Sequence, residues 1–314
     1  MSARRREFIR IQRERARRVY HRARNVWPVW FYVLNWQARR AYARARPALT
    51  WRERAIVTAI DSSGIAVVPM SELFGPETFA ELSRFVHARW LDPAVQAEAA
   101  AHRSQPRDRG DKYYNVDLWE RPRFIRLSDP LIRWSLDERI LRIVAGYLRM
   151  YPKFRAVSLW ASLPVPPGAP EHASQLWHRD PEDKKILKVF LYLSDVDAGA
   201  GPFTYVRASH HGGRWRRLFP QMPPVGFYPP HGAVDRIVPP EDITAVTGPA
   251  GTMIFCDTSG LHKGGYCRER TRFMYQAVFA SPAGLEPLNY RYPPDFDPSG
   301  LTPMAGFALE NREP

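Results

Sequence analysis

The sequence predicts a mainly β protein with flanking helices (α+β), built on an antiparallel sandwich or barrel of the jelly-roll type. Three observations support this prediction. From Phe154 onward, short β-branched and aromatic runs alternate with Gly, Pro and Asp. None of these runs is followed by a helix-length pattern, which argues against a parallel βαβ sheet. Thirty prolines and nineteen glycines favour long loops over a helical bundle.

The chain divides into an arm and one domain. Residues 1–54 are expected to form a basic, aromatic, helical arm, and residues 55–314 the domain. Within the domain we expect a helical part at 55–150, a jelly-roll core at 151–285 and a C-terminal wrap at 286–314.

The helical part can be predicted element by element. Residues 55–70 predict two short strands around a Ser-Ser-Gly turn. Apolar residues at helical spacing predict a helix over 76–91, opened by Pro76, and another over 131–150. Residues 92–129 between them are polar and predict a loop that carries aromatic side chains.

Almost all of the net charge of +14 belongs to the arm, which holds 16 Arg, no Lys and 3 Glu. Its apolar centre, residues 26–34, is too short to span a bilayer, and no signal-peptide cleavage site follows it. With only two cysteines in the chain, the sequence predicts a cytoplasmic protein.

Three interpretations of the arm stay open. Trp27, Trp30 and Trp36 among arginines are typical of a helix at an anionic membrane surface, which would make the protein peripheral to a membrane. The same charges could contact nucleic acid, but no nucleic-acid-binding motif accompanies them and we do not expect such a partner. The simplest interpretation packs the aromatic side on the domain and leaves the arginines solvated.

A His-Arg-Asp tripeptide at residues 178–180 is compatible with two chemistries. A protein kinase catalytic loop would need an Asn five residues after its Asp, where Lys185 stands. The chain also lacks the glycine-rich loop, the strand lysine and the Asp-Phe-Gly of kinases. The kinase interpretation is therefore excluded.

The second chemistry is a metal centre of the two-His, one-carboxylate type, which suits Fe(II). In extended chain, residues two apart project to the same side, so His178 and Asp180 converge while Arg179 points away. His262, after an apolar strand and beside small residues, is the candidate third ligand. Ten residues later, Arg272 opens a strand whose alternation places Arg272, Met274, Gln276 and Val278 on one face. An arginine inside a barrel requires an anionic partner, such as a carboxylate ligand.

Residues 154–280 resemble the phytanoyl-CoA dioxygenase family of Fe(II)- and 2-oxoglutarate-dependent oxygenases. The motifs that carry the resemblance are "WHRD", "LKVFLYLSDVDAGAGPFTYVRASH" and "GTMIFCDTSGLHKGGYCRERTR". The resemblance implies a double-stranded β-helix, a jelly-roll, cupin-like core, and makes residues 55–314 an oxygenase domain. It also implies that His178, Asp180 and His262 are the catalytic iron ligands and that Arg272 binds the distal carboxylate of 2-oxoglutarate. The family's arginine often lies one residue further on, which leaves Arg270 as a second candidate.

The implied activity is a hydroxylation that uses Fe(II), 2-oxoglutarate and O2. Related halogenases lack the carboxylate ligand, so the presence of Asp180 favours hydroxylation. The substrate is not identified by the sequence; the arm favours a lipid-linked or membrane-presented molecule over other small molecules. No oligomeric state follows from the sequence. Two alternatives are a non-catalytic jelly-roll module recruited by the arm, and a metal-dependent isomerase or hydrolase that would leave Arg272 without a partner.

Further residues are candidates for the surroundings of the site. Gln175, Trp177, Tyr205 and Gln276 could lie beside it or pack in the core. The proline-rich stretch 212–248 and residues 111–115 are candidate substrate loops, since long loops in a compact domain are often functional.

Overall fold

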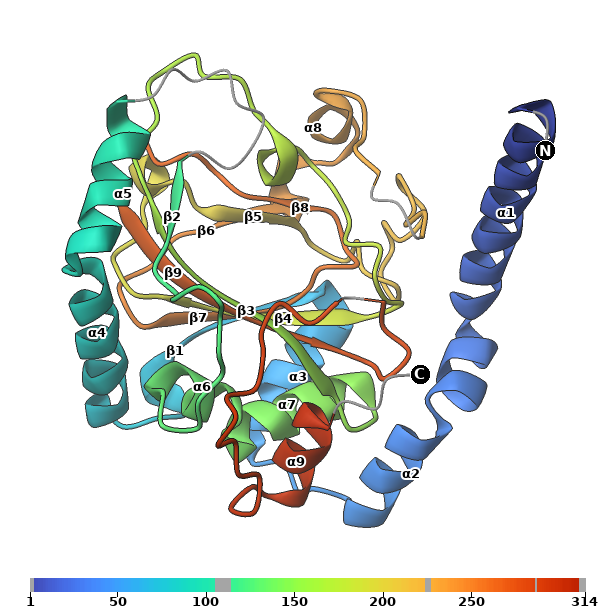
Figure 1. Cartoon of the computed structure of the whole chain (residues 1–314), viewed down its shortest axis with the longest axis horizontal. Helices are drawn as coiled ribbons and strands as arrows, with labels where there is room; N and C mark the ends of the chain where they lie inside the picture. The colour runs from blue at the N-terminus through green and yellow to red at the C-terminus, as the bar shows by residue number, and fades with distance from the viewer. Residues whose placement is uncertain (1–2, 105–113, 224–226, 286, 311–314) are drawn as a thin grey trace.

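The computed structural model describes residues 3–104, 114–223, 227–285 and 287–310. In these residues two antiparallel sheets pack face to face, with helices on the outer face of the larger sheet (Figure 1). The larger sheet has the strand order β1-β7-β4-β9-β3-β2 and the smaller one β6-β5-β8. This arrangement confirms the predicted α+β class with a jelly-roll core.

The bounds of the strands follow the apolar runs of the sequence. They are β1 Ile65–Pro69, β2 Asn115–Asp117, β3 Lys153–Ser162, β4 Ile186–Tyr192, β5 Phe203–Val206, β6 Ile243–Val246, β7 Thr252–Asp257, β8 His262–Lys263 and β9 Arg272–Ala280. The helices of eight residues or more are α1 Ala3–Arg24, α2 Trp36–Ala45, α3 Trp51–Ser63, α4 Pro76–Trp90, α5 Pro93–Ser104 and α7 Glu138–Leu148. Shorter ones are a π-helix at Val29–Leu34, α6 Pro130–Ser135, α8 Ala233–Ile237 and α9 Pro303–Leu309.

Alternation along the central strands separates the core from the cavity. On β9, Phe273, Tyr275, Ala277 and Phe279 face the helices and contribute to the main hydrophobic core. On β4, Leu187, Val189 and Leu191 do the same. The intervening side chains of both strands therefore point toward the smaller sheet, between the two layers, and this is where the predicted face of Arg272, Met274 and Gln276 lies.

Three local predictions for the helical part need correction. The expected strand at residue 55 is instead part of helix α3, because the Thr50 side chain accepts a hydrogen bond from the Glu53 backbone N–H and the Glu53 carboxylate accepts one from the Thr50 backbone N–H. This Thr-x-x-Glu capping box is a helix-start signal that outweighs the β-branched residues after it. The expected loop at 92–129 contains helix α5, and the helix expected over 131–150 is two helices, with Asp137 capping α7. The predicted helix over 76–91 is confirmed as α4.

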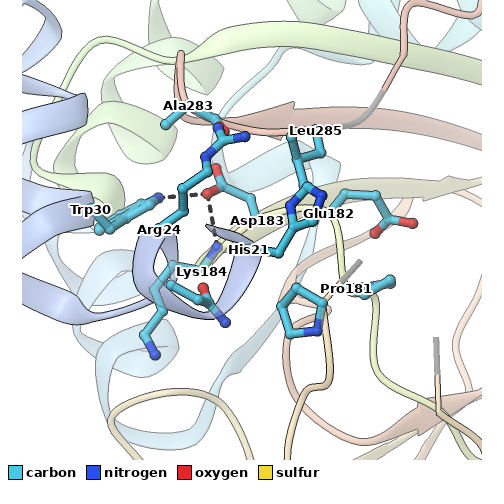
Figure 2. Close-up of a pocket in the computed structure, with 11 residues that line it drawn as sticks. His21, Arg24, Trp30, Pro181, Glu182, Asp183, Lys184, Ala283 and Leu285 are labelled. Atoms are coloured by element: carbon cyan, nitrogen blue, oxygen red, sulfur yellow. Dashed lines mark hydrogen bonds between the residues drawn. The ribbon is translucent and has the colours of Figure 1, made fainter. Parts of the chain in front are cut away.

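The arm contacts the domain through the π-helix that follows α1. Trp30 is 2% exposed, and its indole N–H donates to Asp183 Oδ1 at 2.5 Å (Figure 2). Asp183 also accepts from the backbone N–H of Lys184 and of Ser281. Burial raises the pKa of this carboxyl to about 6. The aromatic side of the arm is thus packed on the domain at Trp30, as the simplest interpretation predicts.

Other parts of the arm stay open to solvent. Trp36 is half exposed, and Tyr32 and Val33 on the π-helix are more exposed still. Helix α1 runs beside the domain without joining its layers (Figure 1). Among the described residues, no helix combines the length and apolar character that crossing a bilayer requires.

Candidate metal and anion site

His178 and His262 are brought together by the backbone itself. The segment before β4 pairs with β8, and the two histidines exchange both backbone hydrogen bonds, each of 3.0 Å. Asp180 is held in the same way, since its N–H donates to the Thr258 carbonyl at 3.0 Å. These two chain segments, about 80 residues apart in sequence, therefore present three candidate ligands at one point.

The three side chains face one another. His178 Nε2 lies 3.9 Å from Asp180 Oδ1, and His262 Nε2 lies 3.8 Å from Asp180 Oδ2. One ligand atom of each residue falls within 4.8 Å of the other two. Two imidazoles and one carboxylate in this arrangement match the ligand set of a non-haem iron site. The predicted convergence of His178, Asp180 and His262 is thus what the structure has, and their role as iron ligands is taken up below.

Hydrogen bonds on the far side of each ring set the tautomer of both histidines. Nδ1 of His178 lies 2.8 Å from the Leu176 carbonyl, and Nδ1 of His262 lies 2.9 Å from the Gly260 carbonyl. A carbonyl only accepts, so each Nδ1 carries the proton and each Nε2 keeps its lone pair for a metal. Burial and the neighbouring His178 lower the pKa of His262 to about 3, so this ring is neutral at pH 7.

Lys188 was not among the predicted site residues, but it lies in the same cavity as the three candidate ligands. Its ammonium lies 2.7 Å from Asp180 Oδ2. Burial alone would raise the pKa of the Asp180 carboxyl, but Lys188, His262 and His178 outweigh burial and hold that pKa well below its usual range. The signal was present in the sequence, because Lys188 interrupts the apolar run of β4 at a position that faces the cavity.

Arg272 lies in the same cavity as the three candidate ligands. This cavity has a volume of about 170 Å³ and is lined by Tyr114, Asn115, Trp160, Ser162, Ser174, Gln175, His178, Asp180, Lys188, Phe190, Phe203, His262, Gly264, Arg272, Met274 and Gln276. The Arg272 side chain is 4% exposed. Its hydrogen bonds are long, 3.2 Å to the Ala200 carbonyl and 3.5 Å to Ser162 Oγ, and its Nε–H has no partner among the described residues.

A buried guanidinium whose partners are neutral oxygens at long distances can still accept an anionic ligand. Among the described residues, no ion pair of Arg272 with a carboxylate occurs, whereas Arg270, the second candidate, is about half exposed and pairs with Asp197. A carboxylate ligand in the cavity would supply both the charge and the hydrogen-bond acceptors that Arg272 lacks. Arg272 is therefore the arginine that the cavity leaves available for an anionic ligand.

Arg179 points away from the cavity, as predicted. Its guanidinium is 4% exposed and donates to five backbone carbonyls, those of Ser209, Trp215, Leu218, Phe219 and Ser259. Burial lowers its pKa to about 10. One side of the His-Arg-Asp segment thus forms the candidate metal site, and the other side anchors the start of the stretch 212–248.

The predictions for the surroundings of the site were partly right. Gln175 and Gln276 line the cavity, and the Gln175 side chain accepts a hydrogen bond from Tyr114. Trp177 instead packs in a separate cluster and donates to Asp235, and Tyr205 is in the core between the sheets.

The two candidate substrate loops reach the site only in part. In the stretch 212–248, the ring of Tyr228 lies 5.9 Å from that of His178. In the other candidate loop, Tyr114 and Asn115 line the cavity, and residues 111–113 lie outside the described residues.

Comparisons with known proteins show the fold. No protein-family model and no curated protein matches the sequence. Among solved structures, EctD from S. alaskensis in its apo form aligns with a TM-score of 0.50 and 18% identity, over 83% of this chain and 87% of that one. The chain therefore shares its fold with EctD. EctD has also been crystallised with bound Fe, and with 2-oxoglutarate and 5-hydroxyectoine.

A second similar structure is SnoN, a non-haem α-ketoglutarate-dependent epimerase from nogalamycin biosynthesis. It aligns with a TM-score of 0.47 and 18% identity, over 73% of this chain and 83% of that one. These likenesses concern architecture only, and the narrower resemblance to the phytanoyl-CoA dioxygenase family stays a prediction.

Proposed function

We propose that the chain is an Fe(II)- and 2-oxoglutarate-dependent oxygenase that hydroxylates an organic substrate. The observation that carries the proposal is the joint content of one cavity. Two imidazoles and a carboxylate converge there, and a buried arginine that has no anionic partner among the described residues lies in the same space. A non-catalytic module would have no physical need for all four groups, and a metal-dependent isomerase or hydrolase would leave Arg272 unmatched.

Each side chain has a defined task in this proposal. His178 and His262 offer Nε2 lone pairs, Asp180 contributes the negative charge, and Lys188 keeps that carboxyl ionised. Arg272 holds the distal carboxylate of 2-oxoglutarate, which orients the other end toward the three ligands. Bound iron would supply the activation of O2, coupled to oxidation of 2-oxoglutarate to succinate and carbon dioxide. Trp160, Phe190 and Phe203 give the cavity an aromatic part of its wall.

The test is an anaerobic titration of the metal-free protein with Fe(II) and then with 2-oxoglutarate. We expect the weak visible metal-to-ligand charge-transfer band of a 2-oxoglutarate–iron chelate with the wild type and no band with His178→Ala. His172→Ala, which alters a histidine outside the cavity, is the matched control and should keep the band. A folded, iron-loaded wild type that gives no band would overturn the proposal.

We also propose that the arm brings the enzyme to an anionic membrane surface, where a lipid-linked substrate is presented. The exposed apolar side chains Tyr32, Val33, Leu34 and Trp36 lie close in sequence to the exposed Arg40 and Arg44. Aromatic and aliphatic groups beside arginines suit the boundary between acyl chains and anionic headgroups.

Because Trp30 and Phe31 are buried, this proposal is tested by substitution rather than by deletion of the arm. Replacing Tyr32, Val33 and Trp36 together by Ser should reduce co-sedimentation with phosphatidylglycerol vesicles at least fivefold. Replacing the comparably exposed Leu91, Met222 and Ile237 by Ser should leave it unchanged. Equal co-sedimentation of the two triple variants would contradict the proposal.

A further inference from the structure

A second polar cavity lies on the other side of the His-Arg-Asp segment, between the arm and the start of the stretch 212–248. It has a volume of about 210 Å³ and is lined by Asn25, Arg179, Lys184, His211, Arg216, Arg217, Pro220, Gln221 and Ser259. None of these residues lines the first cavity. The proposed oxygenase chemistry uses none of them, so this cavity needs an explanation of its own.

The charged side chains that line this second cavity are all positive. Arg179, Lys184, Arg216 and Arg217 are cationic, and no acidic residue is among the lining side chains. Arg179 is anchored by five carbonyls, which satisfy its donors, but no carboxylate among the described residues lies at hydrogen-bond distance from its guanidinium. The buried Asp257 acts electrostatically on Arg179 and Lys184 from outside the lining, but it is one acidic group beside four cations, and a bound anion would relieve the remaining repulsion.

Neutral donors complete the lining. Ser259 is 3% exposed, and its hydroxyl has no hydrogen-bond partner among the described residues. A buried hydroxyl without a partner is costly, and it is satisfied when a ligand oxygen occupies the cavity. The ring of His211 stacks on Trp27 of the arm at 5.0 Å between centroids, which closes one wall.

We propose that this second cavity is a binding site for a phosphate group. A phosphate carries two negative charges near pH 7 and several acceptor oxygens, which match Arg216, Arg217, Lys184 and the Ser259 hydroxyl. The group can belong to a soluble phosphate or to the headgroup of an anionic lipid, and the chemistry of recognition is the same. The inference does not depend on the proposed oxygenase activity.

The position of this site links it to the first cavity. Gln221, which lines it, donates to the backbone carbonyls of Asp180 and Asp183. The Gln221 side chain also lies 3.5 Å from the Asn25 amide of the arm. A phosphate held here therefore contacts the segment that carries two of the candidate metal ligands and the segment that joins the arm to the domain.

Isothermal titration calorimetry of the full chain with pyrophosphate tests the site. We expect saturable 1:1 binding, weakened at least tenfold in R216A/R217A and at least threefold in Ser259→Ala. The control R207A/R236A removes two exposed arginines from outside the cavity and should change the affinity less than twofold. Absence of saturable binding, or equal weakening by the control, would overturn the proposal.

Two additional experiments identify where the anion binds and whether it comes from a soluble phosphate or a lipid. Arg272→Ala should leave pyrophosphate binding unchanged; if it abolishes binding while R216A/R217A does not, the anion occupies the first cavity and the proposal is wrong. Vesicles of phosphatidylcholine with phosphatidic acid, compared with phosphatidylcholine alone, test the lipid source. If the protein binds the phosphatidic acid vesicles and this binding needs Arg216 and Arg217, the site takes a lipid headgroup. If the protein binds pyrophosphate but not these vesicles, the site takes a soluble phosphate.

Discussion

Replacing Arg272 by Ala should raise the concentration of 2-oxoglutarate needed for half-saturation by roughly 30- to 1,000-fold. This range corresponds to about 2–4 kcal/mol, the cost of removing one partner of a desolvated, hydrogen-bonded charge pair. The reason is structural: the Arg272 guanidinium is 4% exposed, and its partners in the described residues are neutral oxygens at 3.2 and 3.5 Å. The measurement is the anaerobic titration of the iron-loaded variant, followed by the charge-transfer band.

Arg270 provides the matched control. It lies two residues before Arg272, but its side chain is about half exposed and paired with Asp197. Surface ion pairs contribute roughly 0–1 kcal/mol, so Arg270→Ala should shift the titration by less than about fivefold. A larger effect from Arg270→Ala than from Arg272→Ala would show that the wrong arginine has been assigned to the ligand. Iron binding without 2-oxoglutarate should be alike in both variants.

Replacing Arg179 by Met should lower the free energy of unfolding by about 3–5 kcal/mol, because each buried polar group left without a hydrogen-bond partner costs about 1–3 kcal/mol. Five backbone carbonyls lose their donor at once, and buried carbonyls without partners are costly. Met keeps much of the side-chain volume, so the loss reports the hydrogen bonds rather than a cavity. Chemical denaturation, with the midpoint and slope compared to the wild type, gives the measurement.

The control for this second prediction is Arg207→Met. Arg207 is exposed and donates to the Glu241 carbonyl. Its replacement should change the free energy of unfolding by less than about 0.5 kcal/mol, as surface substitutions usually do. Native-state proteolysis adds a local measure, because the carbonyls held by Arg179 include those of residues 215, 218 and 219. We expect the protease to cleave this segment faster in the Arg179→Met variant than in the wild type. Equal stability of the two variants would contradict the role assigned to Arg179.

Much of the candidate site could be predicted because its information is local. The period of two in an extended chain placed His178 and Asp180 on one side and Arg179 on the other. The same period separated the cavity face of β9, with Arg272 and Gln276, from its core face. A strand places alternate side chains on opposite faces whatever the rest of the fold does, so such statements carry over directly from sequence to structure.

The secondary-structure predictions were wrong where two local sequence signals competed or where a helix signal was overlooked. The β-branched residues after Trp51 suggested a strand, but the Thr50–Glu53 capping box starts a helix that packs against α7. There Glu53 is 1% exposed and pairs with Arg142 at 2.5 Å, a contact with a partner 89 residues away. Helix α5 was overlooked because few of its residues are large and apolar, so its periodicity is weak.

The sequence by itself determined the α+β class, the faces of the central strands and the residue types of the candidate metal site. Only the tertiary structure decided which distant groups meet. Both the contact of Trp30 with Asp183 and the cationic cavity behind the His-Arg-Asp segment depend on long-range contacts. The physical reason is that periodicity reports the direction of a side chain relative to its own backbone, whereas charge neutralisation and burial depend on elements that the fold brings from elsewhere in the chain.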